Sequence, residues 1–572
     1  MKNLELSQIF YRVADLLEMK EDDTFFESRA YSKAARVLET LDKDVEETYT
    51  SGGLKALQEI PGVGKVIAAG IEEFIKTGKV KVYQKLKRES PVDVDSLIAV
   101  EGLGPRKIKA LYKKLKIKNL KDLKKAAKAG KISKLEGFGE KSEKNILQGI
   151  TFVRQDKGRF VLGSALPLVY QIIGDLEKLP QVKKISPAGS IRRMKETIGD
   201  LDILVVSSKP SQVMDFFVKM PEVDKVWAKG PTKSSVHLKG GLDCDLRIVK
   251  KESFGAALQY FTGSKDHNIL TRRIARQKGL KLNEYGVFKG DRKIAGQSEK
   301  GVYQAIGLPY IEPELRTNTG EIEAALAGRL PNLINYNDIK GDCQSHTNWS
   351  DGISTIEQMA KAAKKMGYQY LAITDHAGFL RIAHGLDEKR LLKQMAEIDK
   401  VNKKVSGIEI LKGAEVDIKE DGSLAIDDHV LAKLDLVVAS IHSSFRMNKQ
   451  SMTKRLIKAI ENPQVNVIAH PTGRLILKRE AYTFDLDKVL KSARVNRVAF
   501  EINAFADRLD LKDTDIRQAI ASGVKLVINT DAHMPDHLKM IELGIAQARR
   551  GWAEKKDILN TRSKEEFLEY FK

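Results

Sequence analysis

Two aspartates, Asp200 and Asp202, stand one residue apart in an apolar run, and their type and spacing suggest chemistry. In a strand, successive side chains point to opposite faces, so both carboxylates share one face while Leu201 lies on the other. Carboxylates held side by side repel each other, and a divalent ion such as Mg²⁺ between them relieves the repulsion. The pair therefore predicts a metal site on a strand. Taken alone, it also fits an ordinary surface strand with acids on its wet face.

Phosphate-binding groups precede this pair. Gly189 and Ser190 can bring backbone N–H groups and a hydroxyl close to a phosphate, and Arg192 and Arg193 add positive charge. Asp245, in the next strand-like run with acids, is our candidate for the third acid of a two-ion site. Metal, phosphate and carboxylates together predict phosphoryl transfer.

Histidines mark a second region. Eight of the ten lie after residue 340, and several directly follow an apolar run, as His376 follows Leu371–Thr374 and His442 follows Leu436–Ile441. One such histidine would usually be a packed or surface residue, but the repetition indicates a metal centre. Helical patterns alternate with the apolar runs, which predicts a β/α barrel whose strands converge on the site at their carboxyl ends.

The first 150 residues have helical apolar spacing and a repeated glycine element. Apolar-x-Gly-apolar-Gly occurs three times, at Gly62 and Gly64, Gly102 and Gly104, and Gly137 and Gly139. A glycine turn that opens a helix presents free N–H groups to an anion. This arrangement resembles the helix-hairpin-helix element, which binds DNA phosphates without reading bases. The lysine-rich segment from Arg106 to Lys134, with Asp122 as its only acid, could neutralise the same backbone.

Composition narrows the class of protein. The net charge is +21 and the pI is near 9.4, which favours a polyanionic partner. Two cysteines provide neither a disulfide framework nor a cysteine-rich zinc site. No apolar run approaches the roughly 18–20 residues of a membrane helix, and the N-terminus lacks a signal-peptide core. We therefore expect a cytoplasmic protein with no membrane partner.

The motifs over about residues 1–315 resemble those of family X DNA polymerases. Gly189-Ser190, about ten residues, Asp200-x-Asp202 and a later Asp245 resemble a nucleotidyltransferase palm. Tyr260-Phe261-Thr262-Gly263-Ser264 follows, as in the family. The resemblance implies an N-terminal all-α helix-hairpin-helix region and an α/β nucleotidyltransferase palm with an α+β thumb.

The same resemblance implies roles for individual residues. Asp200, Asp202 and Asp245 would hold two Mg²⁺ ions, and Asp245 would help take the proton from the primer 3′ hydroxyl. The implied nucleotide contacts are Gly189, Ser190, Arg193, Gly199, Tyr260, Phe261, Gly263, Lys265, Asn268 and Arg272. The chain departs from the family's vertebrate beta enzyme at Met194, where glycine is usual, and at Lys265, where an acid is usual.

Residues 338–572 resemble the polymerase and histidinol phosphatase (PHP) domain, a distorted β/α barrel. The resemblance implies up to three Mn²⁺ or Zn²⁺ ions, bridged partly by Glu415, and a metal-activated water that attacks phosphorus. His384 would contact substrate, and Gln344 stands where the family usually has a histidine. The implied ligands are Gln344, His346, Asp351, His376, Glu415, His442, His470, Asp531 and His533.

These patterns divide the chain into predicted parts. They are a helical DNA-end-binding domain (1–90), a helix-hairpin-helix fingers region (91–150), a palm (151–250), a thumb (251–315), a linker (316–337) and a PHP phosphoesterase domain (338–572).

The leading hypothesis is a monomeric, gap-filling repair polymerase that acts in base excision repair on gapped or primed double-stranded DNA with dNTPs. Its barrel would be a 3′-5′ exonuclease, with 3′-phosphatase and abasic-site endonuclease activities as further candidates. Two alternatives stay open: a PHP nuclease whose palm only binds DNA, and a DNA-end scaffold in which neither site is competent.

Overall fold

The computed structural model describes residues 2–572 except 21–23, 42–43, 99, 101–102, 141, 145, 148–149, 151–157 and 381–382. It divides into two compact units. The first contains residues 1–157 and 477–479, and the second contains residues 158–476 and 480–572.

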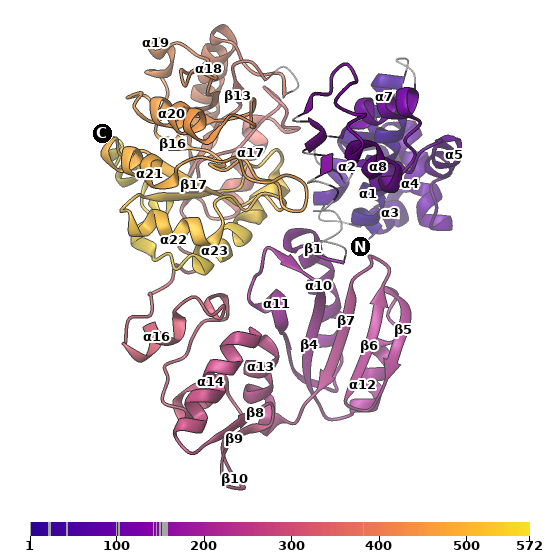
Figure 1. The fold of residues 1–572 in the computed structure, drawn as a ribbon, viewed down its shortest axis with the longest axis vertical. Coiled ribbons are helices and arrows are strands. Elements are labelled where there is room, and N and C mark those ends of the chain that lie inside the picture. The colour runs from indigo at the N-terminus through magenta and orange to yellow at the C-terminus, as the bar shows by residue number, and fades with distance from the viewer. Residues whose placement is uncertain are drawn as a thin grey trace. The chain divides into compact units, whose positions relative to one another are not determined.

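The first unit is helical (Figure 1). Its core forms where the first two helices pack together, with the Phe10 and Tyr31 rings edge to face at 5.3 Å. The predicted all-α class of this region is confirmed. The helices are α1 (Lys2–Met19), α2 (Phe25–Thr40), α3 (Val45–Gln58), α4 (Lys65–Thr77), α5 (Lys81–Glu89), α6 (Val94–Ile98), α7 (Pro105–Leu115) and α8 (Leu120–Lys128).

The repeated glycines occupy helix starts and tight turns. Gly64 directly precedes α4, and Gly104 directly precedes α7. Gly62 and Gly137 both have φ of +81°, a backbone conformation that side chains with a Cβ rarely adopt. The turns at Gly62 and Gly137 therefore need these glycines. Helices α4 and α7 leave their first N–H groups uncapped by side chains.

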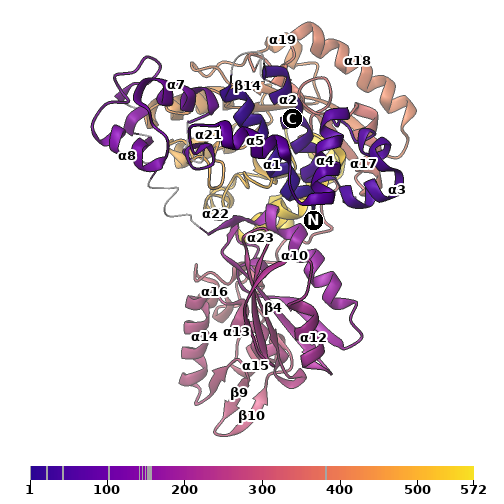
Figure 2. The ribbon, with the colours of Figure 1, turned by 90° about the vertical axis from the view of Figure 1, so that its right-hand side faces the viewer.

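The palm is a five-stranded sheet with strand order β2-β4-β7-β6-β5. β4 and β7 run parallel, whereas the other neighbours are antiparallel. Figure 2 shows the sheet nearly edge-on. Its strands are β2 (Val182–Pro187), β4 (Asp200–Ser207), β5 (Val223–Lys229), β6 (Lys233–Leu238) and β7 (Asp243–Ile248), with helices α10 (Leu162–Glu177), α11 (Gly189–Arg192) and α12 (Pro210–Phe217); β1 (Phe160–Val161) pairs separately with β3 (Thr197–Ile198).

The thumb combines helices with a three-stranded antiparallel sheet, which confirms the α+β class. Its core contains the fully buried Tyr303, Ile306 and Ile311. The connection between the thumb and the barrel contains the short helix α16 (Glu321–Leu326). The other elements are α13 (Phe254–Thr262), α14 (Lys265–Gln277), β8 (Lys281–Asn283), β9 (Gly286–Lys289), β10 (Arg292–Ala295) and α15 (Glu299–Ala305).

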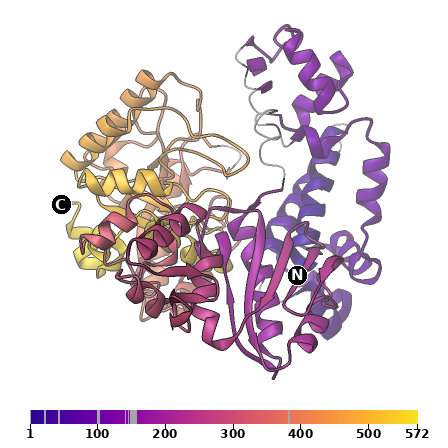
Figure 3. The same cartoon turned by 60° about the horizontal axis from the view of Figure 1, so that its bottom comes forward.

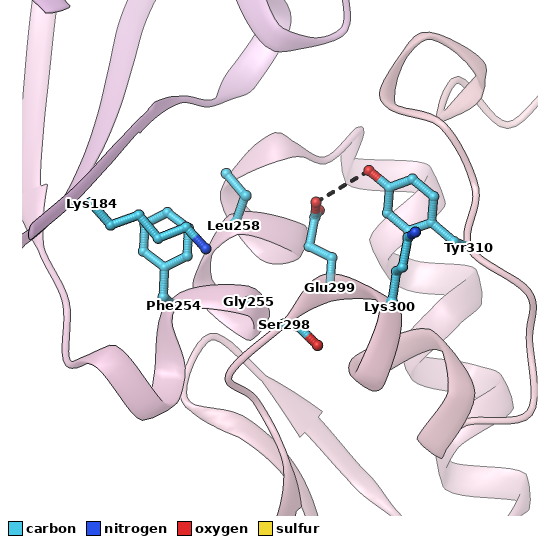
Figure 4. Close-up of a pocket in the computed structure, with 8 residues that line it drawn as sticks. All are labelled: Lys184, Phe254, Gly255, Leu258, Ser298, Glu299, Lys300 and Tyr310. Carbon is cyan, nitrogen blue, oxygen red and sulfur yellow. Dashed lines mark hydrogen bonds between the residues drawn. The ribbon is translucent and has the colours of Figure 1, made fainter.

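An ion-pair network joins palm and thumb. Glu299 accepts from Arg192 of the palm at 2.5 and 2.9 Å and from Arg316 at 2.7 Å. A pocket of about 300 Å³ lies beside this network, and Lys184 stands 4.2 Å from the centroid of the Phe254 ring at its edge (Figure 4). None of the three palm acids lines this pocket, so it is separate from the predicted polymerase site.

The C-terminal part is a parallel, nearly closed barrel with strand order β11-β12-β14-β15-β16-β17-β18 and β13 paired to β14. A parallel bridge between Ser345 and Ala532 brings the first and last strands together. The strands are β11 (Gly341–Asp342), β12 (Tyr370–Ile373), β13 (His376–Ala377), β14 (Glu409–Asp417), β15 (Leu436–Ser440), β16 (Val467–Ile468), β17 (Ala499–Asn503) and β18 (Leu526–Asn529).

Helices flank this sheet (Figures 1 and 3). The predicted β/α barrel is confirmed, and so is the multidomain class of the chain. The helices are α17 (Ile356–Lys365), α18 (Glu388–Lys404), α19 (Asp428–Leu431), α20 (Lys449–Ile460), α21 (Leu486–Val495), α22 (Asp513–Ala521), α23 (Ile541–Arg550) and α24 (Lys564–Glu569).

Two details of the barrel differ from the sequence interpretation. The sequence predicts that Glu415 follows an apolar run at Ile408–Leu411, but β14 continues to Asp417 and Glu415 lies inside it. The sequence does not predict β17, which supplies the buried polar residues Glu501 and Asn503 beside the candidate metal ligands. Separately, no helix among the described residues is long and apolar enough to cross a membrane.

Candidate metal centres in the palm and the barrel

The palm acids lie on two adjacent parallel strands. In the register of β4 and β7, Asp202 stands opposite Asp245 and Asp200 opposite Asp243. Leu201, between the first two acids, is fully buried. Alternation along β4 therefore leaves its two aspartates on one face, with Asp245 beside them.

This cluster is electrostatically strained. Burial, followed by the charges of Asp200 and Asp245, raises the pKa of Asp202 to about 6. Lys233 partly balances the cluster, since its Nζ lies 2.7 Å from Asp245 Oδ2. A cation between the carboxylates would relieve the repulsion, so the acids fit a divalent metal.

The phosphate-binding side lies next to the acids. Gly189 has φ of +61°, and a Cβ there would meet Asp202 Oδ2 at 2.8 Å. Only glycine therefore lets the α11 turn approach the acid without displacement. A cavity of about 590 Å³ opens here, lined by Arg159, Ser190, Arg193, Lys195, Gly199, Asp200, Asp243 and Asp245.

Sequence reasoning missed three of these lining residues. Arg159 is fixed by hydrogen bonds from Nε and Nη2 to Thr197 at 2.9 and 2.7 Å. Asp243, at the start of β7, accepts from Trp227 Nε1 at 3.0 Å, so its carboxylate is already engaged. Lys195 lies among acids and arginines, and burial lowers its pKa.

The predicted thumb contacts gather at the junction of α13 and α14, and they do not line the 590 Å³ cavity. Arg193 connects the two places, because its Nη1 donates to the Thr262 carbonyl. Asn268 donates to the Tyr260 carbonyl at 2.7 Å and accepts from Gln259 at 2.8 Å. Gly263 also belongs to this junction, which further contains Tyr260, Phe261, Lys265 and Arg272.

In the barrel, the histidines and acids lie on or just after the parallel strands and come together. Three groups of side chains each bring their ligand atoms within 4.8 Å of one another. The groups are His346, Asp351, His376 and His533; His376, Glu415 and His442; and His346, Glu415 and Asp531.

Glu415 stands at the centre of these groups. Its Oε1 lies 2.9 Å from His470 Nε2 and 3.3 Å from His442 Nε2. Its Oε2 lies 3.0 Å from His376 Nδ1 and 3.5 Å from His346 Nε2. One carboxylate between four imidazoles has the geometry of a bridging ligand.

Gln344 is fully buried, and its amide has no hydrogen-bond partner on either Oε1 or Nε2 among the described residues. Its backbone N–H donates to Asp342 at 3.1 Å, so the backbone is held by a hydrogen bond and the side-chain amide is not. An unpartnered buried amide costs free energy unless a ligand engages it. Its oxygen, together with the imidazole clusters, fits a bound metal ion.

The carboxylates of the barrel favour positive charge on two of its histidines, His346 and His442, but not on His470. Burial alone would lower the pKa of His346, but its hydrogen bond to Asp531 and the nearby carboxylates raise it to about 10. For His442, Glu415 and Asp417 outweigh burial and raise the pKa to about 9. Burial and then the Arg508 charge lower the pKa of His470 to about 4. The carboxylates thus attract cations, whether protons or metal ions.

The structure adds supporting residues that sequence reasoning missed. Asp417 accepts from His442 Nδ1 at 2.7 Å and from the Phe379 N–H at 2.8 Å. Asp375 accepts five hydrogen bonds, from Thr347, Ser350 and Gln394. Such outer groups fix ligand orientation. Their positions in the sequence could have indicated this role, since Asp417 stands two residues after Glu415 and Asp375 directly precedes His376.

Two predicted contact residues, His384 and Gly102, are not placed at a candidate site. His384 is exposed on the loop before α18, and its carbonyl accepts from Arg390 at 2.7 Å. Among the described residues it joins none of the three ligand groups. Gly102 lies outside the described residues, so only Gly62, Gly64, Gly104, Gly137 and Gly139 of the predicted DNA contacts are placed.

Family models match four parts of the chain. A helix-hairpin-helix domain matches residues 1–80 and a SAM-like helix-hairpin-helix tandem matches 94–150. The DNA polymerase beta thumb matches residues 257–317 and the PHP domain matches 342–505.

Individual relatives agree with these matches. The chain is 40% identical over 568 residues to the DNA polymerase/3′-5′ exonuclease PolX of Bacillus subtilis, covering 98% of both chains. It is 25% identical over 355 residues to DNA polymerase lambda of Arabidopsis thaliana, covering 55% of this chain and 62% of the relative. A probable phosphatase of Thermoanaerobacter sp. is 32% identical over 231 residues, 38% of this chain and 89% of the relative.

Proposed function

Because the chain belongs to the bacterial family X DNA polymerases that carry a C-terminal PHP domain, we propose that it fills short gaps in DNA and removes nucleotides from 3′ ends at a second site. The observation that carries this proposal is the presence of two separate donor sets in one chain. One is the acid pair of β4 with Asp245 on β7, and the other surrounds Glu415.

In the palm, the chain's own residues bind and orient the reactants. Ser190 and Arg193 bind the triphosphate in the 590 Å³ cavity, and Gly189 keeps the α11 turn close to the acids. Asp200, Asp202 and Asp245 would hold two Mg²⁺ ions, which would supply positive charge for the attacking and leaving oxygens. Asp245 takes the proton from the primer 3′ hydroxyl. The 3′ oxygen then bonds to the α-phosphorus, and pyrophosphate leaves.

The thumb junction completes the nucleotide site. Tyr260 and Phe261 pack against the sugar, and Gly263 allows the backbone to approach it. Asn268 and Arg272 reach the minor-groove side of the nascent pair once the Asn268 hydrogen bonds to neighbouring backbone and side chain open. Lys265, at the start of α14, lies exposed where it can meet the incoming nucleotide.

In the barrel, metal-dependent hydrolysis removes the last nucleotide. The predicted ligands around Glu415 would hold up to three Mn²⁺ or Zn²⁺ ions, which would supply an activated water and positive charge for the phosphate. The water oxygen bonds to phosphorus, the bond from phosphorus to the preceding 3′ oxygen breaks, and that oxygen leaves with a proton. The product is a nucleoside 5′-monophosphate. Glu415 holds the imidazoles in place, and Asp417 orients His442.

DNA ends are bound by the helix-hairpin-helix turns and the Arg106–Lys134 segment, which contact phosphates rather than bases. The substrates are gapped or primed double-stranded DNA and dNTPs, and the protein acts as a cytoplasmic monomer. We assign DNA-end binding to residues 1–90 and 91–150, nucleotide addition to 151–250 and 251–315, and 3′ degradation to 338–572, with 316–337 as the linker.

Primer extension tests the proposal. DNA with a one-nucleotide gap and Mg²⁺ should incorporate a labelled dNTP, and without dNTPs and with Mn²⁺ the same 3′ end should be shortened. His470→Ala should abolish the shortening alone. A gap that is never filled, while 3′ ends are still degraded, would leave the alternative of a PHP nuclease with a DNA-binding palm.

The match to a probable phosphatase favours a second activity for the barrel. Its site would then also hydrolyse a 3′-phosphomonoester, since both reactions place a phosphorus atom beside the same water. Release of inorganic phosphate from a 3′-phosphorylated primer, lost in His470→Ala, tests this. Cleavage of DNA at an abasic site, compared between the parent and His470→Ala, tests the third candidate activity.

A further inference from the structure

Arg508 lies in the loop that follows β17, beside the barrel ligands. Its Nε is 3.5 Å from Asp531 Oδ2, and its side chain is only 20% exposed. The backbone N–H of Arg508 donates to the Phe505 carbonyl at 2.9 Å, which fixes the start of the side chain. A cationic group is therefore held close to the metal ligands.

The guanidinium of Arg508 has unused donors. Among the described residues it makes no hydrogen bond, and its contact with Asp531 is a charge contact alone. Three other arginines of the barrel differ, because each donates to backbone carbonyls of nearby loops. They are Arg390 to His384 and Gly385, Arg455 to Ser443 and Ile418, and Arg474 to Leu509.

Asp531 does not need Arg508 to hold it. Its Oδ2 already accepts from Asn503 Nδ2 at 3.1 Å, and its Oδ1 lies 3.1 Å from His346 Nε2. Asn503 alone can orient the carboxylate. Arg508 therefore stands next to this ligand without serving as its main support.

The charge of the donor groups also indicates that Arg508 is available to a substrate. The three donor groups contain the carboxylates of Asp351, Glu415 and Asp531. Three divalent ions would more than neutralise them, so a loaded site requires no counter-ion from Arg508. The group that balances both the ions and the arginine is an anion, and a phosphodiester presents oxygens that match a guanidinium.

We propose that Arg508 is a catalytic residue of the barrel, whose guanidinium donates to a non-bridging oxygen of the scissile phosphate. This inference rests on the proposed phosphoesterase function. The contact strengthens as negative charge develops on the phosphorus oxygens. The same contact serves phosphodiesters and phosphomonoesters, because both present such oxygens.

The test uses the full chain with Arg508→Gln, Arg508→Lys and the control Lys512→Gln. Lys512 is half exposed and pairs with Asp515 at 3.7 Å, so the control removes one positive charge from the same segment. The probe is the 4-nitrophenyl ester of thymidine 5′-monophosphate with Mn²⁺, which reports on the phosphate contact without DNA binding.

We expect kcat/KM for Arg508→Gln to fall by about 10- to 100-fold, the range of a charge-assisted hydrogen bond. Arg508→Lys should recover part of this loss, and Lys512→Gln should stay within about twofold of the parent. Bound manganese after dialysis and the thermal melting profile should be unchanged in all three. Thymidine 5′-monophosphate, measured by calorimetry, should bind the manganese-loaded Arg508→Gln protein more weakly than the parent.

Two results overturn the inference while leaving the proposed function in place. One is an Arg508→Gln protein as active as the parent. The other is an Arg508→Gln protein that loses manganese as Asp531→Ala does, because Arg508 would then support the metal rather than the substrate. A parent protein that hydrolyses neither the ester nor DNA 3′ ends overturns the proposed function and this inference with it.

Discussion

Replacing Asp202 with asparagine should stabilise the metal-free palm while it abolishes nucleotide addition. Burial and the neighbouring Asp200 and Asp245 raise the pKa of Asp202 from 3.8 to about 6. For an acid, a folded pKa above the unfolded value means that the folded state favours the proton. Stability is therefore highest below about pH 4, falls as the pH rises to about 6, and stays low above it.

The size of this effect follows from the shift. About two pKa units correspond to about 3 kcal/mol, at about 1.36 kcal/mol per unit. This is an upper limit, because relaxation and partial solvent access reduce it. Asparagine keeps the shape of the side chain and removes the charge, so the variant should gain up to this amount at pH 7.5 and almost nothing at pH 4. Magnesium should stabilise the parent protein more than the variant.

Hydrogen–deuterium exchange of the β4 and β7 amides in EDTA measures the gain, because local opening reports the free energy of the palm without unfolding the whole chain. At pH 7.5, protection should rise by up to about 100-fold in the variant. Asp224→Asn, at an exposed position of β5, is the matched control and should change nothing. Equal protection of Asp202→Asn and the parent at pH 7.5 would refute the claim that the acids repel each other.

Three further outcomes follow from the same arguments. Affinity for gapped DNA should fall by orders of magnitude between about 50 and 200 mM salt, because the glycine turns and lysines contact phosphates; a flat response in a filter-binding titration would exclude this. The resemblance to family X polymerases implies that Gly70, in α4, takes the place of the Schiff-base lysine used by members with sugar-phosphate lyase activity. Glycine has no amine, so borohydride should not trap an incised abasic end on residues 60–80. Efficient trapping there would contradict the expectation. Gln344→His should increase the zinc that the protein retains after dialysis, because an imidazole suits zinc better than an amide oxygen does. After chelation, the nuclease activity of the parent should recover best with Mn²⁺. Equal zinc retention in both proteins, without a Mn²⁺ preference in the parent, would show that Gln344 does not tune the site.

The sequence was informative where periodicity and chemistry coincide. The alternation around Leu201 assigned both palm aspartates to one face, and apolar runs that end in histidines indicated parallel strands. Asp245 could be chosen as the third acid because it stands in a run of strand residues. Its pairing with Asp202 could not be deduced, since register depends on which strands become neighbours in the folded sheet.

The groups that support the barrel ligands could not be predicted from the sequence for a different reason. β17 ends in Asn503 rather than in a histidine or a carboxylate, so its run did not resemble the other barrel strands. Asn503 and Glu501 nevertheless lie under the site, with Glu501 accepting from the His470 N–H at 2.7 Å. Arg508 stands in a loop without periodicity. Residues of this kind are recognised only when burial and unsatisfied hydrogen-bonding groups are visible.

The central claim is that one chain contains two independent metal-dependent active sites. Its most direct test measures nucleotide addition and 3′ degradation on the same gapped DNA for Asp200→Ala and Asp531→Ala. Asp200→Ala should lose addition and keep degradation, and Asp531→Ala should do the reverse. A folded Asp200→Ala protein that has also lost 3′ degradation would contradict the claim.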